Sequence, residues 1–157
     1  MRVIHPFEPV CGAGAKIIIL GTIPSPASRR QGFYYGHPRN RFWRVLAGLF
    51  GSEIPGSVGQ KTDLLVRNGI ALWDAAAKCE ISGAEDYSIR APELNDVAGF
   101  MESRGIARAF ANGQTAGRLL RKGGVDAVIL PSTSPANAKM GLDELKEKWS
   151  AILEFLG

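Results

Sequence analysis

Four short apolar runs, each of strand length, alternate with amphipathic stretches along this chain of 157 residues. They cover residues 16–20, 69–73, 106–110 and 127–130, and turn-forming or polar residues follow each of them. Runs this short and this apolar are typical of parallel strands that are buried on both faces. The alternation therefore predicts an α/β fold, a three-layer α/β/α sandwich built on a four-stranded parallel sheet.

Helical periodicity occupies the stretches between these runs and the end of the chain. Helices are expected over residues 41–50, 60–68, 96–103, 114–122 and 142–156, the third of them capped by Asn95. No internal repeat, linker or low-complexity segment divides the chain, and 45% hydrophobic residues suffice for one core. A single domain over residues 1–157 is expected.

The cysteine content argues against a metal centre. Cys11 and Cys79 are the two cysteines, and no C-x-x-C pair is present. The ligands of a zinc site or of a cluster held by four thiolates are therefore missing. Free thiols are favoured over a disulfide, and no secretory signal or membrane-spanning run is found. We expect a cytoplasmic protein that is monomeric by default.

Positive charge is concentrated near the first apolar run. Residues 1–44 contain seven Lys or Arg and one acid, although the whole chain carries only +4. Four of the arginines (29, 30, 39 and 41) lie in the segment 21–43, beside Phe33, Tyr34 and Tyr35, and these four are expected to contact phosphates. Loops at the carboxyl end of a buried strand are where open α/β sheets bind ligands, and arginines beside aromatic rings suit a nucleotide. Nucleic acid is the predicted partner, and a solvated basic face without a partner is the alternative.

The carboxyl ends of parallel strands meet at one edge of a sheet, which gathers polar residues from four segments. We expect residues 21–28, Asp74, Asn112 and residues 131–137 to share this edge. A site there would combine amides and hydroxyls with the aromatic rings of the first long loop. Its serines and threonine, at positions 132, 133 and 134, are suited to binding phosphates.

The blocks GTIPSPAS, YYGHPRNRFW, LWD, FANG and LPSTSPAN, in this order, resemble the uracil-DNA glycosylase superfamily. Within it the chain is most similar to the hypoxanthine-DNA (deoxyinosine) glycosylase branch, often called family 6. The resemblance covers nearly the whole chain and implies the fold predicted above. It also implies a monofunctional glycosylase of base excision repair, without metal or cofactor. Such an enzyme flips a deaminated base, hypoxanthine or uracil, out of DNA and hydrolyses its N-glycosidic bond to leave an abasic site.

The first loop departs from other branches of the superfamily. Uracil-excising members carry a water-activating Asp there and mismatch-specific members an Asn, but residues 21–25 contain neither. The hypoxanthine branch uses a later Asn, which the motif match places at Asn40. An Asn amide does not titrate, but it can hold a water through its carbonyl oxygen while its NH2 bonds elsewhere. The alternative role for Asn40 is to cap the helix that begins near Arg41.

Further contacts are expected around Asn40. Asn112, which resembles the base-reading Asn of the family, would bind the flipped base through one donor and one acceptor, or else serve as a turn residue before Gly113. Either Tyr34 or Tyr35 would stack on the base. Gly21 and Thr22 complete the expected base site, and the DNA backbone would be bound by Ser25, Ser28, Arg39, Ser132, Ser134 and Asn137.

Other functions stay open at this point. Uracil excision restricted to mismatches or single strands is one, and an inert module that binds damaged DNA is another. A small-molecule hydrolase using Ser28, His37 and Asp74 is the third, although it lacks a G-x-S-x-G elbow. His37 could equally be structural. No lysine lies inside the motif blocks to form a Schiff base, although Lys139 follows the last block closely.

Overall fold

The computed structural model describes residues 2–4, 7–23, 28, 32–80 and 90–156, with backbone alone at 2–4, 78–80 and 90–91. A four-stranded parallel sheet in the order β3-β2-β6-β7 forms its centre. The strands are β2 (Ile17–Gly21), β3 (Ile70–Asp74), β6 (Arg108–Asn112) and β7 (Val128–Leu130). The predicted sheet is confirmed, with strand ends shifted by one or two residues.

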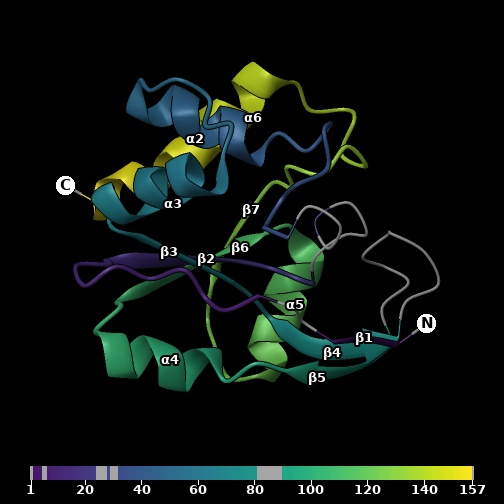
Figure 1. Cartoon of the computed structure of the whole chain (residues 1–157). Coiled ribbons are helices and arrows are strands. Elements are labelled where there is room, and N and C mark those ends of the chain that lie inside the picture. Colours follow the sequence, from purple (N-terminus) through teal and green to yellow (C-terminus); the bar gives the residue numbers. More distant parts are fainter. Residues whose placement is uncertain (1, 5–6, 24–27, 29–31, 81–89, 157) are drawn as a thin grey trace.

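Helices cover both faces of this sheet, so the three-layer prediction is confirmed (Figure 1). One face carries α2 (Phe42–Phe50), α3 (Val58–Arg67) and α6 (Leu142–Trp149), which the 3₁₀ helix η2 (Ser150–Phe155) continues; the other carries α4 (Val97–Arg104) and α5 (Gln114–Lys122). The predicted Asn95 cap is wrong, because the Asp96 carboxylate accepts the Gly99 N–H of α4 at 3.0 Å. Asn95 instead donates its side-chain N–H to the carbonyl of Asp74.

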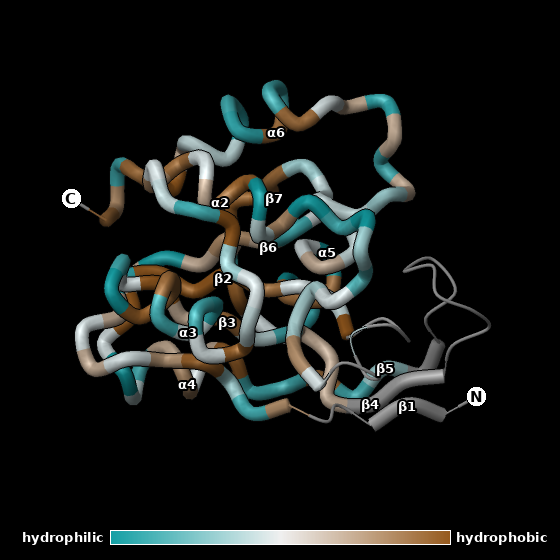
Figure 2. Tube along the Cα trace, turned by 45° about the horizontal axis from the view of Figure 1, so that its top comes forward, coloured by the Kyte–Doolittle hydropathy of each residue, from teal (hydrophilic) through white to brown (hydrophobic). Residues whose placement is uncertain are grey.

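The central strand β2 is apolar on both sides. Ile17 and Ile19 pack into the cluster formed with α2, α3 and α6, whereas Ile18 and Leu20 pack into the cluster formed with α4 and α5. All four side chains are fully buried, and each contributes about 1.5–3 kcal/mol through its removal from water. The hydrophobic strands run between the more polar outer helices (Figure 2). This two-sided burial explains why the sequence shows continuous apolar runs instead of alternation.

A second, three-stranded antiparallel sheet in the order β1-β4-β5 was not predicted. It consists of β1 (Arg2–Ile4), β4 (Ala76–Glu80) and β5 (Arg90–Leu94), and it lies beside the main sheet near the N terminus (Figure 1). Only one residue, Ala75, separates β4 from β3, and its N–H donates to the carbonyl of Gly21. The chain therefore passes from the main sheet to the small one directly beside the carboxyl end of β2.

The strand order places a topological switch point between β2 and β6. The chain leaves β2 toward β3 on one side, and later returns to β6 on the other side. Connections on opposite sides separate the segments that follow these two strands, which is where open α/β sheets bind ligands. The segments that begin at Gly21 and Asn112 border this position.

Candidate active site

Three polar side chains from separate segments meet at the carboxyl edge of the sheet. Asn40 precedes α2, Asn112 ends β6, and Thr133 follows β7. The Thr133 hydroxyl donates to Asn40 Oδ1 at 2.8 Å and accepts from Asn112 Nδ2 at 3.0 Å. The Thr133 backbone N–H also donates to Asn112 Oδ1 at 3.0 Å. The structure thus brings together the two predicted amides, with one threonine between them.

Thr133 is the residue of this group whose role sequence reasoning missed. The sequence pattern predicts that it binds phosphate together with Ser132 and Ser134, but its side chain is fully buried. Ser132 and Ser134 on either side are half-buried. The available signal was the residue type, because a β-branched side chain between two serines is the one best suited to a packed position.

Asn40 uses its carbonyl oxygen entirely within the protein. Besides the Thr133 hydroxyl, Asn40 Oδ1 accepts the backbone N–H of Phe42, the first residue of α2, at 3.0 Å. The predicted capping role is therefore confirmed, although the helix boundary makes Arg41 the formal cap residue. A carbonyl oxygen has two lone pairs, and both are occupied here. The prediction that this oxygen is open to a water is wrong. The other terminal atom of the amide, Asn40 Nδ2, has no hydrogen-bond partner among the described residues.

Asn112 keeps part of its hydrogen-bonding capacity. Its side chain is 6% exposed, and both of its amide atoms bind Thr133. An amide oxygen accepts two hydrogen bonds and an amide nitrogen donates two, so one position remains on each atom. The arrangement is therefore compatible with the predicted recognition of a base edge.

The segment that carries Asn40 is fastened to the loop that carries Thr133. The Asn40 N–H donates to the carbonyl of His37 at 2.9 Å, and the Arg41 N–H donates to the carbonyl of Thr133 at 3.0 Å. The Arg41 guanidinium donates to three further carbonyls of that loop, those of Ser134, Asn137 and Met140. Arg41 therefore uses three of its five guanidinium N–H donors to hold this loop, which is a structural role that the sequence did not predict.

His37 and Arg39 form the outer edge of the same turn. His37 Nδ1 accepts the backbone N–H of Arg39 at 3.0 Å, so the neutral imidazole carries its proton on Nε2. His37 is half-buried and Arg39 is exposed. Among the described residues, neither His37 Nε2 nor the Arg39 guanidinium has a hydrogen-bond partner. Both are donors that an approaching anion can reach.

In the loop after β7, the hydroxyl oxygens of Ser132 and Ser134 accept hydrogen bonds from backbone N–H groups of the same loop. Ser132 Oγ accepts the N–H of Ser134, and Ser134 Oγ accepts the N–H of Ala136, each at 3.1 Å. Each hydroxyl proton then remains to be donated. Asn137 donates its side-chain N–H to the carbonyl of Ser132 at 3.0 Å, which closes the loop. The predicted roles of these three residues toward DNA fit this arrangement.

Tyr34 does not lie in the site. Its side chain is 2% exposed, its hydroxyl donates to the carbonyl of Glu8 at 2.9 Å, and its ring packs edge-on against Phe7 and Phe33. Burial, with a smaller contribution from Asp74, raises the pKa of Tyr34 above its usual range. The prediction that Tyr34 stacks on a base is wrong, because both of its faces belong to the core.

Tyr35 is the remaining candidate of the pair. It is half-buried, and its ring stacks on that of Phe42 with centroids 4.1 Å apart. Its backbone has φ of 54°, a left-handed conformation unusual for a residue with a side chain. The ring packs against α2, the helix that begins with Phe42.

Gly21 allows three groups to converge at the end of β2. A Cβ atom at Gly21 would lie 2.6 Å from Asp74 Oδ1 and 2.8 Å from the Tyr35 hydroxyl oxygen. Asp74 and Thr22 are both buried there, at 3% and 5% exposure. A side chain at position 21 would therefore displace the edge of the site.

Ser28 has a structural role. It is 2% exposed, its hydroxyl accepts the N–H of Gly36 at 2.8 Å, and its carbonyl accepts those of Gly32 and Phe33. The prediction that Ser28 binds the DNA backbone is wrong, because the residue is enclosed by its own loop. The same burial removes it as a nucleophile for the hydrolase alternative. The predicted contacts Ser25, Arg29 and Arg30 lie outside the described residues.

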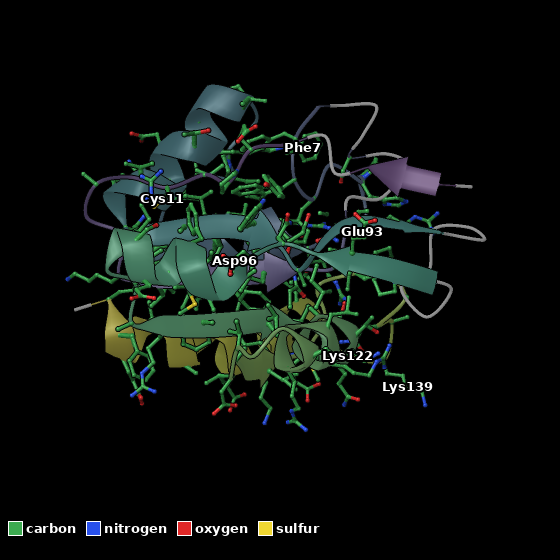
Figure 3. The ribbon with its side chains drawn as sticks, turned by 90° about the horizontal axis from the view of Figure 1, so that it is seen from below. Phe7, Cys11, Glu93, Asp96, Lys122 and Lys139 are labelled. Carbon is green, nitrogen blue, oxygen red and sulfur yellow. The ribbon has the colours of Figure 1, made fainter. Side chains whose placement is uncertain are left out.

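Within the described ranges, no group of three or more His, Cys, Asp or Glu side chains is placed to hold a metal ion. None of the helices found there is long and apolar enough to cross a bilayer. Lys139 is exposed, and its side chain extends outward from the protein (Figure 3).

Comparison with known proteins gives consistent matches over the whole chain. The family model described as the uracil DNA glycosylase superfamily matches residues 8–156. A hypoxanthine DNA glycosylase from Methanosarcina acetivorans is 34% identical over 151 residues, 93% of this chain and 95% of that protein. A hypoxanthine DNA glycosylase from Methanosarcina barkeri is 33% identical over 149 residues, which are 92% of this chain and 94% of that protein. The solution NMR structure of a candidate uracil DNA glycosylase from M. acetivorans has a TM-score of 0.81 at 32% identity and covers 99% of both chains.

Proposed function

Since this chain belongs to the uracil DNA glycosylase superfamily and is a DNA N-glycosylase, we propose that it excises hypoxanthine from DNA as a step of base excision repair. The observation that carries the proposal is the hydrogen-bonded group of Asn40, Thr133 and Asn112 at the switch point of the sheet. It contains no titrating group, which suits a reaction driven by positioning and electrostatics.

The target nucleotide has to leave the duplex to reach this group. Asn112 is nearly buried and Thr133 fully so, and a base stacked inside DNA cannot approach side chains at that depth. Base flipping is therefore part of the proposal. Tyr35 would stack on the extruded base, while the free positions of the Asn112 amide would bind its polar edge.

The reaction is hydrolysis. The bond between the sugar C1′ and the base nitrogen breaks with its electron pair going to the base, and a water oxygen forms the new bond to C1′. One proton of that water is released and the departing base takes up a proton, so the products are free hypoxanthine and an abasic site. Because the base carries negative charge as it leaves, N–H donors facing it lower the barrier. The Nε2 proton of His37 and the free N–H groups of the two amides are such donors.

Contacts to the DNA backbone support the flipped state. The hydroxyl protons of Ser132 and Ser134 remain available for phosphate oxygens, and exposed Arg39 supplies a positive charge near them. Lys139 extends outward, which favours a monofunctional glycosylase over one that forms a Schiff base. One subunit suffices for these contacts, so we propose a monomer.

The test uses end-labelled duplexes that contain one deoxyinosine or one deoxyuridine opposite each normal base, with single-stranded controls. Hot alkali after incubation cuts any abasic site. Cleavage at inosine is expected, together with a loss of at least about 100-fold in the single-turnover rate of Asn40→Ala. Asn68→Ala is the matched control, because Asn68 donates to the carbonyl of Leu64 just before β3 begins, at the opposite edge of the sheet.

The outcomes separate the candidate functions. Alkali-dependent cleavage at uracil alone would replace hypoxanthine by the alternative substrate within the same superfamily. Intact binding without any cleavage would favour a module that recognises damaged DNA and would remove Asn40 from the catalytic role.

A further inference from the structure

The orientation of the Asn40 amide follows from backbone groups that can only donate. The Phe42 N–H lies 3.0 Å from one terminal atom of this side chain, so that atom has to be the oxygen. The opposite orientation would place two donors against each other. One backbone group therefore directs the Asn40 oxygen toward the protein.

A second backbone donor fixes the same orientation through Thr133. The Thr133 N–H lies 3.0 Å from one terminal atom of Asn112, which makes that atom Oδ1. The other atom is then Nδ2, and it donates to the Thr133 hydroxyl. Because the Thr133 hydroxyl accepts from Asn112, its own proton is free to be donated, and it is donated to Asn40 Oδ1 at 2.8 Å. Asn112, Thr133 and Asn40 thus form a chain with a single direction.

We propose that Thr133 is a positioning residue that holds Asn40 with its NH2 group toward the reacting nucleotide, so that Asn40 acts there as an N–H donor. This inference rests on the proposed glycosylase function. It adds which atom of the Asn40 amide, the NH2 group and not the oxygen, faces the substrate. Asn40 Nδ2 has no partner among the described residues, and the side chain is only partly buried, so the donor is accessible.

The polarity decides what Asn40 can do. An amide NH2 can donate to a ring nitrogen or a carbonyl oxygen of the departing base, or to a lone pair of the incoming water. It cannot accept a proton from that water. Asn40 therefore stabilises the charge that develops as the base leaves, and the water needs no base at this position.

A carboxylate at position 40 tests the polarity directly. In Asn40→Asp one oxygen can accept from Phe42 and Thr133 as before, and Asp is as good a helix cap as Asn, so the variant is expected to fold. Its second oxygen would replace the NH2 with an acceptor. The single-turnover rate on deoxyinosine duplex is expected to fall as far as that of Asn40→Ala, at every pH between about 5 and 9. An Asn40→Asp enzyme with a rate near wild type would overturn the proposal, because it would show that an acceptor works there.

Substitution of Thr133 tests the positioning role. Thr133→Val removes the hydroxyl at nearly constant volume, and Thr133→Ser keeps the hydroxyl while it removes a methyl group. We expect the valine variant to lose roughly 100-fold in single-turnover rate, the order expected when a reacting group is displaced by about 1 Å. The serine variant should stay within about threefold of wild type. The Kd for substrate DNA should change by less than about threefold in both, because the hydroxyl is buried and Asn40 still faces the DNA.

Controls separate this role from general destabilisation and from failure of the proposed function. Asn68→Ala lowers stability at the opposite edge of the sheet, so a drop in rate that merely follows the thermal midpoint would appear in it as well. A valine variant at wild-type rate, or a serine variant as slow as valine, would overturn the proposal. Failure of the proposed function would appear differently, as a wild-type enzyme that does not cleave deoxyinosine duplex at all.

Discussion

Replacement of Arg41 by Lys is expected to destabilise the protein although the charge is kept. The guanidinium donates to the carbonyls of Ser134 at 3.1 Å, Asn137 at 2.9 Å and Met140. A planar fork reaches three such acceptors, whereas an ammonium group is a compact point donor that holds one of them. Each hydrogen bond to a charged group contributes about 1.5–3 kcal/mol. Since Arg41 is only half-buried, loss of two of them should lower the free energy of unfolding by roughly 2–4 kcal/mol.

Urea unfolding measures this loss, and Arg39 provides the matched comparison. Arg39 lies two residues earlier and is exposed, so Arg39→Gln should change the free energy of unfolding by less than about 0.5 kcal/mol. If Arg39 binds a phosphate, the same change should reduce the slope of log K against log salt by about 0.9. Arg41→Gln should leave that slope unchanged while it lowers stability.

The reverse pattern would refute the structural role of Arg41. Wild-type stability in Arg41→Lys, combined with a salt slope reduced by about one in Arg41→Gln, would mean that the guanidinium binds DNA. The loop after β7 would then have to be held by other contacts.

Two further substitutions test the surroundings of the site. Gly21→Ala should lower the free energy of unfolding by about 1–3 kcal/mol and slow turnover, because the new Cβ would lie 2.6 Å from Asp74 Oδ1 and 2.8 Å from the Tyr35 hydroxyl oxygen. Gly14→Ala is its control in the same urea and turnover assays, because nothing lies within 4 Å of a Cβ there. Tyr34→Phe should cost about 0.5–1.5 kcal/mol through the lost bond to Glu8 and leave turnover unchanged. The raised pKa of Tyr34 means that the folded state keeps its proton where the unfolded state loses it, so wild-type stability should fall above about pH 10 more steeply than that of Tyr34→Phe. Parallel pH profiles of the two proteins would contradict this explanation.

The main sheet could be predicted because its signal is local. Strand β2 is buried on both faces, so every residue from Ile17 to Leu20 is apolar, and no helix period or alternation competes with that interpretation. Gly51 and Gly105, which end α2 and α4, adopt the left-handed conformation that favours glycine at a helix end. Each of these features depends on neighbours a few residues away.

The small antiparallel sheet was missed because its strands lack such a signal. Strand β4 begins with Ala76 and Ala77, and β5 contains Pro92, which is depleted in strands. These segments become strands because β3 ends beside Gly21. The next residues, Ala75 and Ala76, bond to the carbonyls of Gly21 and Thr22 at the carboxyl end of β2, and β4 then pairs with β1 and with β5. Such long-range pairing is not encoded in a window of a few residues.

Residue types in the site could be predicted from sequence, but their directions could not. The motifs and the rule for strand ends were enough to bring Asn40 and Asn112 to one edge of the sheet. Which atom of an amide faces outward depends on the donors beside it, here the backbone N–H groups of Phe42 and Thr133, and these come from segments 91 residues apart in the chain. Partners within the protein likewise occupy the buried Ser28 hydroxyl and three of the Arg41 donors. A list of polar residues on a loop therefore overstates a binding site until each donor and acceptor has been assigned a partner. The groups left over here, Asn40 Nδ2, His37 Nε2 and the hydroxyl protons of Ser132 and Ser134, are donors, and the Asn112 amide adds one open donor and one open acceptor position. Such donors complement an electron-rich base and a phosphate.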